Sequence, residues 1–180
     1  MKVIRFPVVF KTRTQALQEP TADAPVVRAK VDLRKASLEQ LSQRFKELPE
    51  AREAAVAGHY EAFFLGPWWL RSLAPLSMPL VGLPGWCGKY LIGNGHATNL
   101  LRQGRLPQRE AVPMHVSSLP SRVDGQPTLT HTYPPGSPLL LRFFIDELRA
   151  ADQRTLLGMT TIDLPLVRRF PLPFMLRKPG

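Results

Sequence analysis

The sequence predicts a mostly β protein: an antiparallel β-barrel of about eight strands, with an N-terminal helix and a hydrophobic lid segment. Three observations indicate this fold. Nineteen prolines among 180 residues are too many for a helical bundle, because each one removes a backbone donor. About eight short segments alternate apolar and polar residues and are separated by turn signals at close intervals. The connection between the first two segments is too apolar for an ordinary solvated loop.

The composition is that of a folded globular chain with a basic surface. Hydrophobic residues make up 44% and charged residues 21% of the chain, which suits one well-packed domain. The formal net charge is +10, but the lysines and arginines are scattered, and no run of five or six marks an arm that binds nucleic acid. We therefore expect no nucleic-acid partner and interpret the charge as a solvated basic surface.

Three features bear on the compartment. Cys87 is the only cysteine, which excludes an internal disulfide. The start of the chain is basic with an apolar run too brief for a secretory signal. Four prolines, Arg71 and Lys89 interrupt the apolar belt from Phe63 to Ile92, whereas a spanning helix needs about 20 uninterrupted apolar residues. These features predict a cytoplasmic protein, with peripheral contact with a membrane as an open alternative.

The N-terminal part is predicted to contain one helix. Residues 1–36 have an irregular composition, with one extended stretch over Val3–Phe10. Ser37 is followed three residues later by Gln40, which is a capping-box pattern. Apolar residues then recur at helical spacing until Pro49 ends the run. We expect a helix over 37–48 that leads into a single barrel domain over 37–180.

Beyond Gly58 the apolar period changes from helical to two, which is typical of strands. Glycines at 93 and 95 predict one hairpin turn, and Asp124–Gly125 predicts another. The longest predicted β segment runs over 138–148. The predicted strands are 58–66, 85–94, 96–102, 111–119, 126–133, 138–148, 154–162 and 172–178.

The segment 66–84, between the first two strands, is rich in tryptophan, leucine and proline. An eight-stranded barrel is just wide enough to hold one small ligand when side chains do not fill its interior. An apolar insertion at the mouth of such a barrel would be a lid, with Trp68, Trp69 and Leu73 as its candidate residues on one or two helical turns. Their aromatic and basic surroundings fit a membrane interface as well as they fit burial in the core.

The stretch GWCGKYL at 85–91 is similar to the Trp-x-Gly-Lys core of the GxWxG domain of small bacterial proteins. Two later segments, IDELRAADQRTLLGMTTIDLP at 145–165 and PFMLRK at 173–178, have counterparts in those proteins in the same order. The chain therefore resembles them in scattered motifs within 58–178, although Pro84 stands where the first glycine of the motif would fall. The resemblance implies a lipocalin-like barrel and no established activity.

Candidate ligand-binding residues are those that a hollow barrel would place around its contents. Arg142, Arg149 and Arg177 could each hold a carboxylate head group through two hydrogen bonds. The structural alternatives are a local ion pair for Arg149 and packing of the Arg177 stem across an aromatic ring. The remaining candidates are Trp86, Lys89, Tyr90, His131, Tyr133 and Phe143.

The sequence predicts no catalytic residue, cofactor or metal. It contains no nucleophile motif, phosphate-binding loop or dinucleotide fingerprint. The four histidines, at 59, 96, 115 and 131, lack the close spacing of a metal site. A cyclase or isomerase barrel with His131 or Asp146 as its base is the enzymatic alternative.

The preferred function is binding of a small hydrophobic or amphipathic molecule, such as a fatty-acid-like ligand, inside the barrel. The first alternative is an interaction module that docks a membrane or a protein partner through the apolar segment 63–83. The second is the barrel enzyme. A cavity favours ligand binding, a solid core favours the interaction module, and His131 or Asp146 facing into a cavity favours the enzyme. The oligomeric state is left open.

Overall fold

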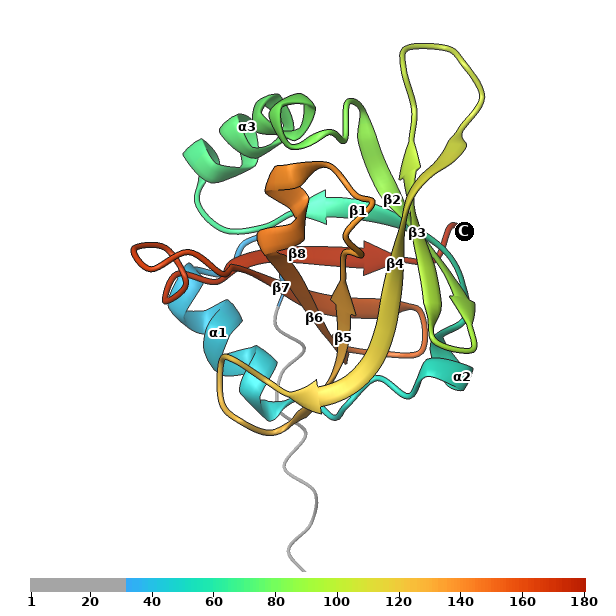
Figure 1. Ribbon diagram of the computed structural model, residues 1–180. Coiled ribbons are helices and arrows are strands. Elements are labelled where there is room, and N and C mark those ends of the chain that lie inside the picture. Colours follow the sequence, from blue (N-terminus) through green and yellow to red (C-terminus); the bar gives the residue numbers. More distant parts are fainter. Residues whose placement is uncertain (1–31) are drawn as a thin grey trace, which may run out of the picture. The chain divides into compact units, whose positions relative to one another are not determined.

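The computed structural model describes residues 32–180, so the extended stretch expected over Val3–Phe10 lies outside the described residues. The described chain forms eight antiparallel strands that close into a barrel, in which β1 pairs with both β2 and β8 (Figure 1). This confirms the mostly β, antiparallel barrel predicted from the sequence. The strands are β1 (Gly58–Phe64), β2 (Trp86–Gly93), β3 (His96–Leu101), β4 (Arg109–Pro120), β5 (Pro127–Thr132), β6 (Phe144–Ala150), β7 (Thr155–Ile162) and β8 (Leu172–Arg177).

The segment predicted as the longest strand, 138–148, is divided in the structure. Its first part forms a 3₁₀ helix, η2 (Leu139–Phe143), and β6 begins only at Phe144. Pro138 starts the turn, because its carbonyl accepts a hydrogen bond of 3.0 Å from the backbone N–H of Leu141. The longest strand is instead β4, which has 12 residues.

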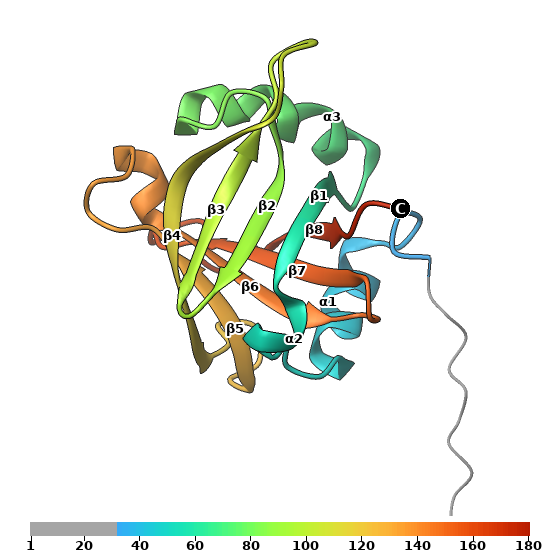
Figure 2. The same ribbon diagram turned by 90° about the vertical axis from the view of Figure 1, so that its right-hand side faces the viewer.

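Helix α1 (Leu38–Glu47) begins with the predicted capping box. The Gln40 backbone N–H donates to the Ser37 hydroxyl at 3.2 Å, and the Ser37 N–H donates to the Gln40 side chain at 2.9 Å. Leu41 and Phe45 are fully buried on the apolar face of the helix. The helix lies on the outside of the barrel (Figure 2). Its buried side chains pack against the outward residues of β7 and β8, so this part of the outer wall is a second core.

Three short helical elements occupy the connections around β1. Helix α2 (Glu53–Val56) precedes β1, and α3 (Trp68–Ser77) and the 3₁₀ helix η1 (Met78–Val81) follow it. Helix α3 is longer than the one or two turns expected and continues past Pro75. It lies with η1 over one end of the barrel (Figure 2). Across residues 32–180, no helix is long and apolar enough to cross a membrane.

The barrel interior is packed at the end opposite α3. Buried apolar side chains from different strands fill that half, among them Tyr60, Leu91, Leu148, Leu156 and Leu176. In an eight-stranded barrel, side chains can fill the interior or leave room for one small ligand. This barrel does both, because its other half contains the cavity described below.

Two glycines allow close contacts between neighbouring strands. A Cβ at Gly88 would overlap the backbone oxygen of Tyr60 on the neighbouring strand. A Cβ at Gly158 would overlap the ring of Phe174, which lies across the inward surface of β7. Gly88 is the glycine of the Trp-x-Gly-Lys motif, so in this chain the motif glycine has a packing role.

Candidate functional site

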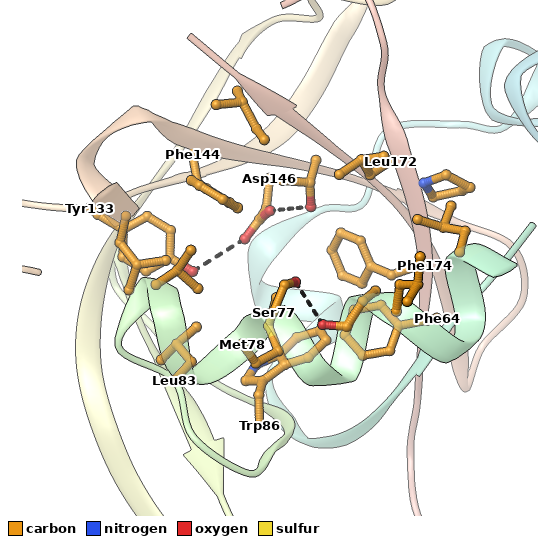
Figure 3. Close-up of a pocket in the computed structure, with 18 residues that line it drawn as sticks. Phe64, Ser77, Met78, Leu83, Trp86, Tyr133, Phe144, Asp146, Leu172 and Phe174 are labelled. Carbon is orange, nitrogen blue, oxygen red and sulfur yellow. Dashed lines mark hydrogen bonds between the residues drawn. The ribbon is translucent and has the colours of Figure 1, made fainter. Parts of the chain in front are cut away.

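A cavity of about 370 Å³ lies at the end of the barrel beneath α3 (Figure 3). Its walls are mainly apolar and come from the barrel, α3 and η1. The barrel contributes five aromatic residues, Phe64, Trp86, Tyr133, Phe144 and Phe174. The covering helices contribute Leu70, Leu73, Ala74, Ser77, Met78 and Val81.

Asp146 is the only charged residue among those that line the cavity. It lies on the inward face of β6, with Phe144 and Leu148 before and after it on the same face. Its Oδ1 accepts a hydrogen bond of 2.6 Å from the Thr160 hydroxyl. Its Oδ2 accepts a 3.4 Å hydrogen bond from the Tyr133 hydroxyl (Figure 3). The same oxygen lies 2.5 Å from Lys89 Nζ. One carboxylate thus has three donors around it at the floor of an apolar pocket.

Lys89 comes from β2 and is completely buried behind Asp146. Its ammonium group also lies 3.2 Å from the Met114 sulfur and within 6 Å of the rings of Tyr133 and Phe174. A buried ion pair needs such surroundings, because each charge loses its hydration and must recover it from its partner and its neighbours. Lys89 is therefore part of the site floor without being a wall of the cavity.

A chain of hydrogen bonds extends from Asp146 along the cavity wall. The Asn99 side-chain amide lies 3.5 Å from the Tyr133 oxygen, and its carbonyl accepts a 3.0 Å hydrogen bond from the Trp86 indole. Burial, reinforced by the charge of Asp146, raises the pKa of Tyr133 well above its ordinary value. Tyr133 therefore keeps its proton and remains a donor toward the carboxylate.

His131 lies directly opposite Asp146 in the β5–β6 register and also points inward. It is fully buried, and neither ring nitrogen has a hydrogen-bond partner. Burial, together with the nearby positive charge of Lys89, lowers the pKa of His131 well below its ordinary value. The ring is thus a neutral group packed beside the ion pair, and it does not line the cavity.

Arg149 lies on the outer face of β6, away from the cavity. Its guanidinium forms two hydrogen bonds of 2.8 Å with the Asp124 carboxylate and a third, of 2.9 Å, with the Phe45 carbonyl at the end of α1. Burial alone would raise the pKa of Asp124, but these hydrogen bonds hold it below its ordinary value. This placement corrects the expectation of a ligand anchor, because odd-numbered β6 residues face outward.

Four other sequence candidates also lie outside the cavity lining. Arg142 is exposed on η2, where its Nε donates to the Ser137 carbonyl at 3.0 Å. Arg177 is exposed on the outer face of β8. Tyr90 stacks on His59 on the outside of the barrel, with 4.1 Å between ring centroids. Phe143 ends η2, so the next residue, Phe144, is the one that lines the cavity.

The candidate lid residues divide between two sides of α3. Leu73 lines the cavity, whereas Trp68 and Trp69 do not. The two tryptophans are 73% and 47% exposed and project outward. The segment 66–84 therefore covers the barrel end with one side and presents an apolar surface with the other.

Of the sequence candidates, the structure brings Trp86, Lys89, His131 and Tyr133 together around Asp146. Sequence reasoning missed Asn99 and Thr160, which have no charge to mark them. It named Asp146 only as an alternative catalytic base. A usable signal was present, because Lys89 and Asp146 are each the one charged residue on an otherwise apolar strand face. Two such charges of opposite sign predict a pair inside a barrel.

Two histidines lie close together on the outside of the barrel, but they are not part of a metal site. His96 and His115 face each other on the outer surface, with ring centroids 6.1 Å apart. Within residues 32–180, no three His, Cys, Asp or Glu side chains are grouped as a metal ion would need.

Fold and site together define a closed eight-stranded antiparallel barrel with an apolar end cavity and a buried ion pair at its floor. No protein-family model and no curated protein matches this chain. Among solved structures, it is similar to a crystallised protein from Thermomonospora curvata, with a TM-score of 0.57 and 14% sequence identity. The match covers 77% of this chain and 84% of that chain. At this identity the likeness shows the fold alone.

Proposed function

We propose that this protein binds one small, mostly apolar molecule in the cavity beneath α3. The observation that carries the proposal is an apolar, aromatic-walled cavity that ends at a single buried polar cluster. Small-molecule sites in proteins combine these two features, with volumes of about 300–1,000 Å³. The 370 Å³ found here suits a compact molecule, and its ring-lined walls favour a flat or cyclic one.

The polar cluster indicates which polar group the ligand would carry. Asp146 presents a carboxylate to the cavity, while the Lys89 ammonium lies behind it. A hydroxyl or N–H group of the ligand can donate to Asp146 or to the Thr160 oxygen. A ligand carboxylate would instead face a like charge, and none of the three arginines considered from the sequence lines the cavity. An amphipathic ligand with a neutral donor group therefore fits better than a fatty acid.

We also infer a distant relationship to the GxWxG-type proteins. Three residues of the motif have roles around the site in this chain, which supports the inference. Trp86 lines the cavity, Gly88 permits the close approach of β1, and Lys89 pairs with Asp146.

A barrel enzyme is the second candidate, and the inward position of Asp146 is the observation that favours it. As a base, its carboxylate would take a proton from a bound substrate. Three donors already surround its oxygens, and a carboxylate has about four acceptor sites, so one site remains for the substrate proton. Asp146→Asn separates the two functions. An isomerised product formed by the wild type and not by the variant, from the same bound compound, would establish the enzyme.

Titration with the neutral, apolar fluorophore N-phenyl-1-naphthylamine tests ligand binding. Ala74 lines the cavity, so Ala74→Phe should fill it and weaken fluorophore binding at least tenfold. The matched control is Leu76→Phe, which adds an aromatic ring on the exposed side of the same helix and should leave binding unchanged. Native mass spectrometry of the purified protein would then identify any molecule that co-purifies.

Two outcomes of these experiments would contradict the proposal. Equal fluorophore binding by the wild type and Ala74→Phe would mean that the fluorophore binds elsewhere. No binding by the wild type, together with a clean unliganded mass, would contradict ligand binding in this cavity.

A further inference from the structure

The barrel end that holds the cavity also carries most of the exposed apolar surface. In a barrel whose strands follow one another in sequence, alternate connections lie at the same end. Four connections, 65–85, 102–108, 133–143 and 163–171, therefore surround the cavity end, and we call their outer surface the mouth face (Figures 1 and 2). Twelve of the fifteen exposed large apolar residues in 32–180 lie in these connections. The most exposed include Trp68, Leu76, Leu80, Leu166 and Phe170.

Charge is distributed unequally between the two ends of the barrel. The mouth face contains six arginines and one acidic residue, Asp163. That carboxylate is already paired with Arg122, at 2.8 Å. The connections at the opposite end, 49–57, 94–95, 121–126, 151–154 and 178–180, contain four basic and four acidic residues. The excess positive charge of the loops is therefore confined to the end with the exposed apolar side chains.

We propose that the mouth face docks on an anionic lipid surface. Exposed tryptophan and leucine side chains enter the boundary between head groups and acyl chains, and arginines around them attract acidic lipids. Among the described residues, Arg71, Arg102 and Arg105 form no ion pair, so their charges are available to phosphate groups. The apolar side chains are spread over all four connections, with five on 65–85 and four on 163–171. A fluid lipid surface accommodates such a pattern without the shape complementarity that a protein partner requires.

Docking by this face would place the cavity beside the bilayer. Leu73 and Ala74 line the cavity from the inner side of α3, while Trp68 and Leu76 project from its outer side. One helix thus contacts both the bound molecule and the lipid. The docking inference does not depend on the proposed ligand, because the surface pattern is present whether or not the cavity is occupied.

Flotation of the full chain with lipid vesicles at physiological salt tests the inference. We expect binding to vesicles of phosphatidylcholine mixed with phosphatidylserine, and little binding to phosphatidylcholine alone. The apolar variant Leu76→Ser/Leu80→Ser should bind at least tenfold more weakly. Arg71→Gln/Arg105→Gln should also lose at least tenfold, since each arginine near a charged surface contributes about fivefold.

Matched controls separate docking from a general effect of the net charge. Arg52→Gln/Arg154→Gln removes the same charge from the opposite end, and Ile92→Ser removes an exposed apolar side chain from a strand. Both should bind as the wild type does. Equal loss in Arg52→Gln/Arg154→Gln would overturn the proposal, because binding would then follow net charge alone. Absence of vesicle binding would overturn it too, as would a dimer in light scattering that Leu76→Ser/Leu80→Ser abolishes without any lipid binding.

Discussion

Lys89 and Asp146 form an ion pair of 2.5 Å across the interior of the barrel, from β2 on one side to β6 on the other. Their side chains are only 1% and 7% exposed. The pair therefore joins two strands that share no backbone hydrogen bonds. It also separates the packed half of the interior from the cavity, which makes it both a structural element and the floor of the site.

Lys89→Met should destabilise the protein, because the methionine has a similar shape but leaves the Asp146 carboxylate buried without its partner. Breaking a buried pair on one side typically costs about 3–5 kcal/mol. Chemical denaturation of the wild type and the variant would measure the loss in free energy of unfolding. The double variant Lys89→Met/Asp146→Leu should recover most of it, because no unpaired charge remains. A single variant that costs less than about 1 kcal/mol would contradict the importance of the pair.

His131 should make stability depend on pH below about 6.5, the ordinary pKa of histidine. Burial and Lys89 depress the pKa of His131 in the folded state. Between that lowered value and about 6.5, the unfolded chain binds a proton that the folded chain does not. The free energy of unfolding therefore falls as the pH falls, by up to about 1.4 kcal/mol per pH unit.

Denaturation curves of the wild type and His131→Leu at pH 7.5, 6.5 and 5.5 would check this expectation. The variant should lose the pH-dependent part, whereas His115→Gln, at an exposed position, should keep it. Parallel pH profiles for the wild type and His131→Leu would show that the ring is not responsible.

Gly158→Ala should destabilise the barrel by about 1–3 kcal/mol, the usual cost of overpacking a core. The added methyl group would overlap the Phe174 ring, which also lines the cavity. Phe174→Leu should relieve the overlap, so the cost of Gly158→Ala should be smaller in that background. A double-mutant cycle by urea denaturation measures this coupling. Additive effects would mean that the two positions are independent.

Arg149→Met should reduce stability by about 3 kcal/mol or more and leave ligand binding unchanged. The variant removes the partner of Asp124 and the donor to the Phe45 carbonyl, both on the outside of the barrel. Urea denaturation and N-phenyl-1-naphthylamine titration would measure the two effects separately. Arg177→Met, at an exposed position, should change neither by more than about 0.5 kcal/mol. If Arg149→Met were well folded but bound the fluorophore more weakly, Arg149 would contribute to ligand binding after all.

The strands and hairpins were predictable because their signals are local. Alternation at period two marks each strand, and the glycines at 93, 95 and 125 mark turns that the structure contains. The division of 138–148 was not predictable from periodicity, because a short apolar run has the same pattern in a strand and in a 3₁₀ helix. The four-residue helix α2 was missed because it is too short to show a period.

The site was harder to predict because both faces of β6 are buried. Phe144 and Asp146 face the interior, while Glu147 and Arg149 face outward beneath α1 and the loop that contains Asp124. Hydrophobicity alone cannot tell such faces apart, since the outer wall under α1 is itself a core. Alternation along β6 assigned its residues correctly to two faces. Which face points into the cavity depends on the packing of α1, which is far from β6 in the sequence.

Closure of the barrel has a consequence for how the chain folds. Seven of the strand pairings join neighbours in sequence, whereas β1 and β8 pair across most of the described chain, from Glu61 opposite Arg177 to Phe64 opposite Phe174. Ordering so long a loop costs more entropy than forming any hairpin, and such contacts slow folding. We expect the β1–β8 seam to form last. Pulsed hydrogen exchange during refolding would then show the amides of that seam gaining protection after those of the β2–β3 hairpin, so a curved, open sheet precedes the finished ring.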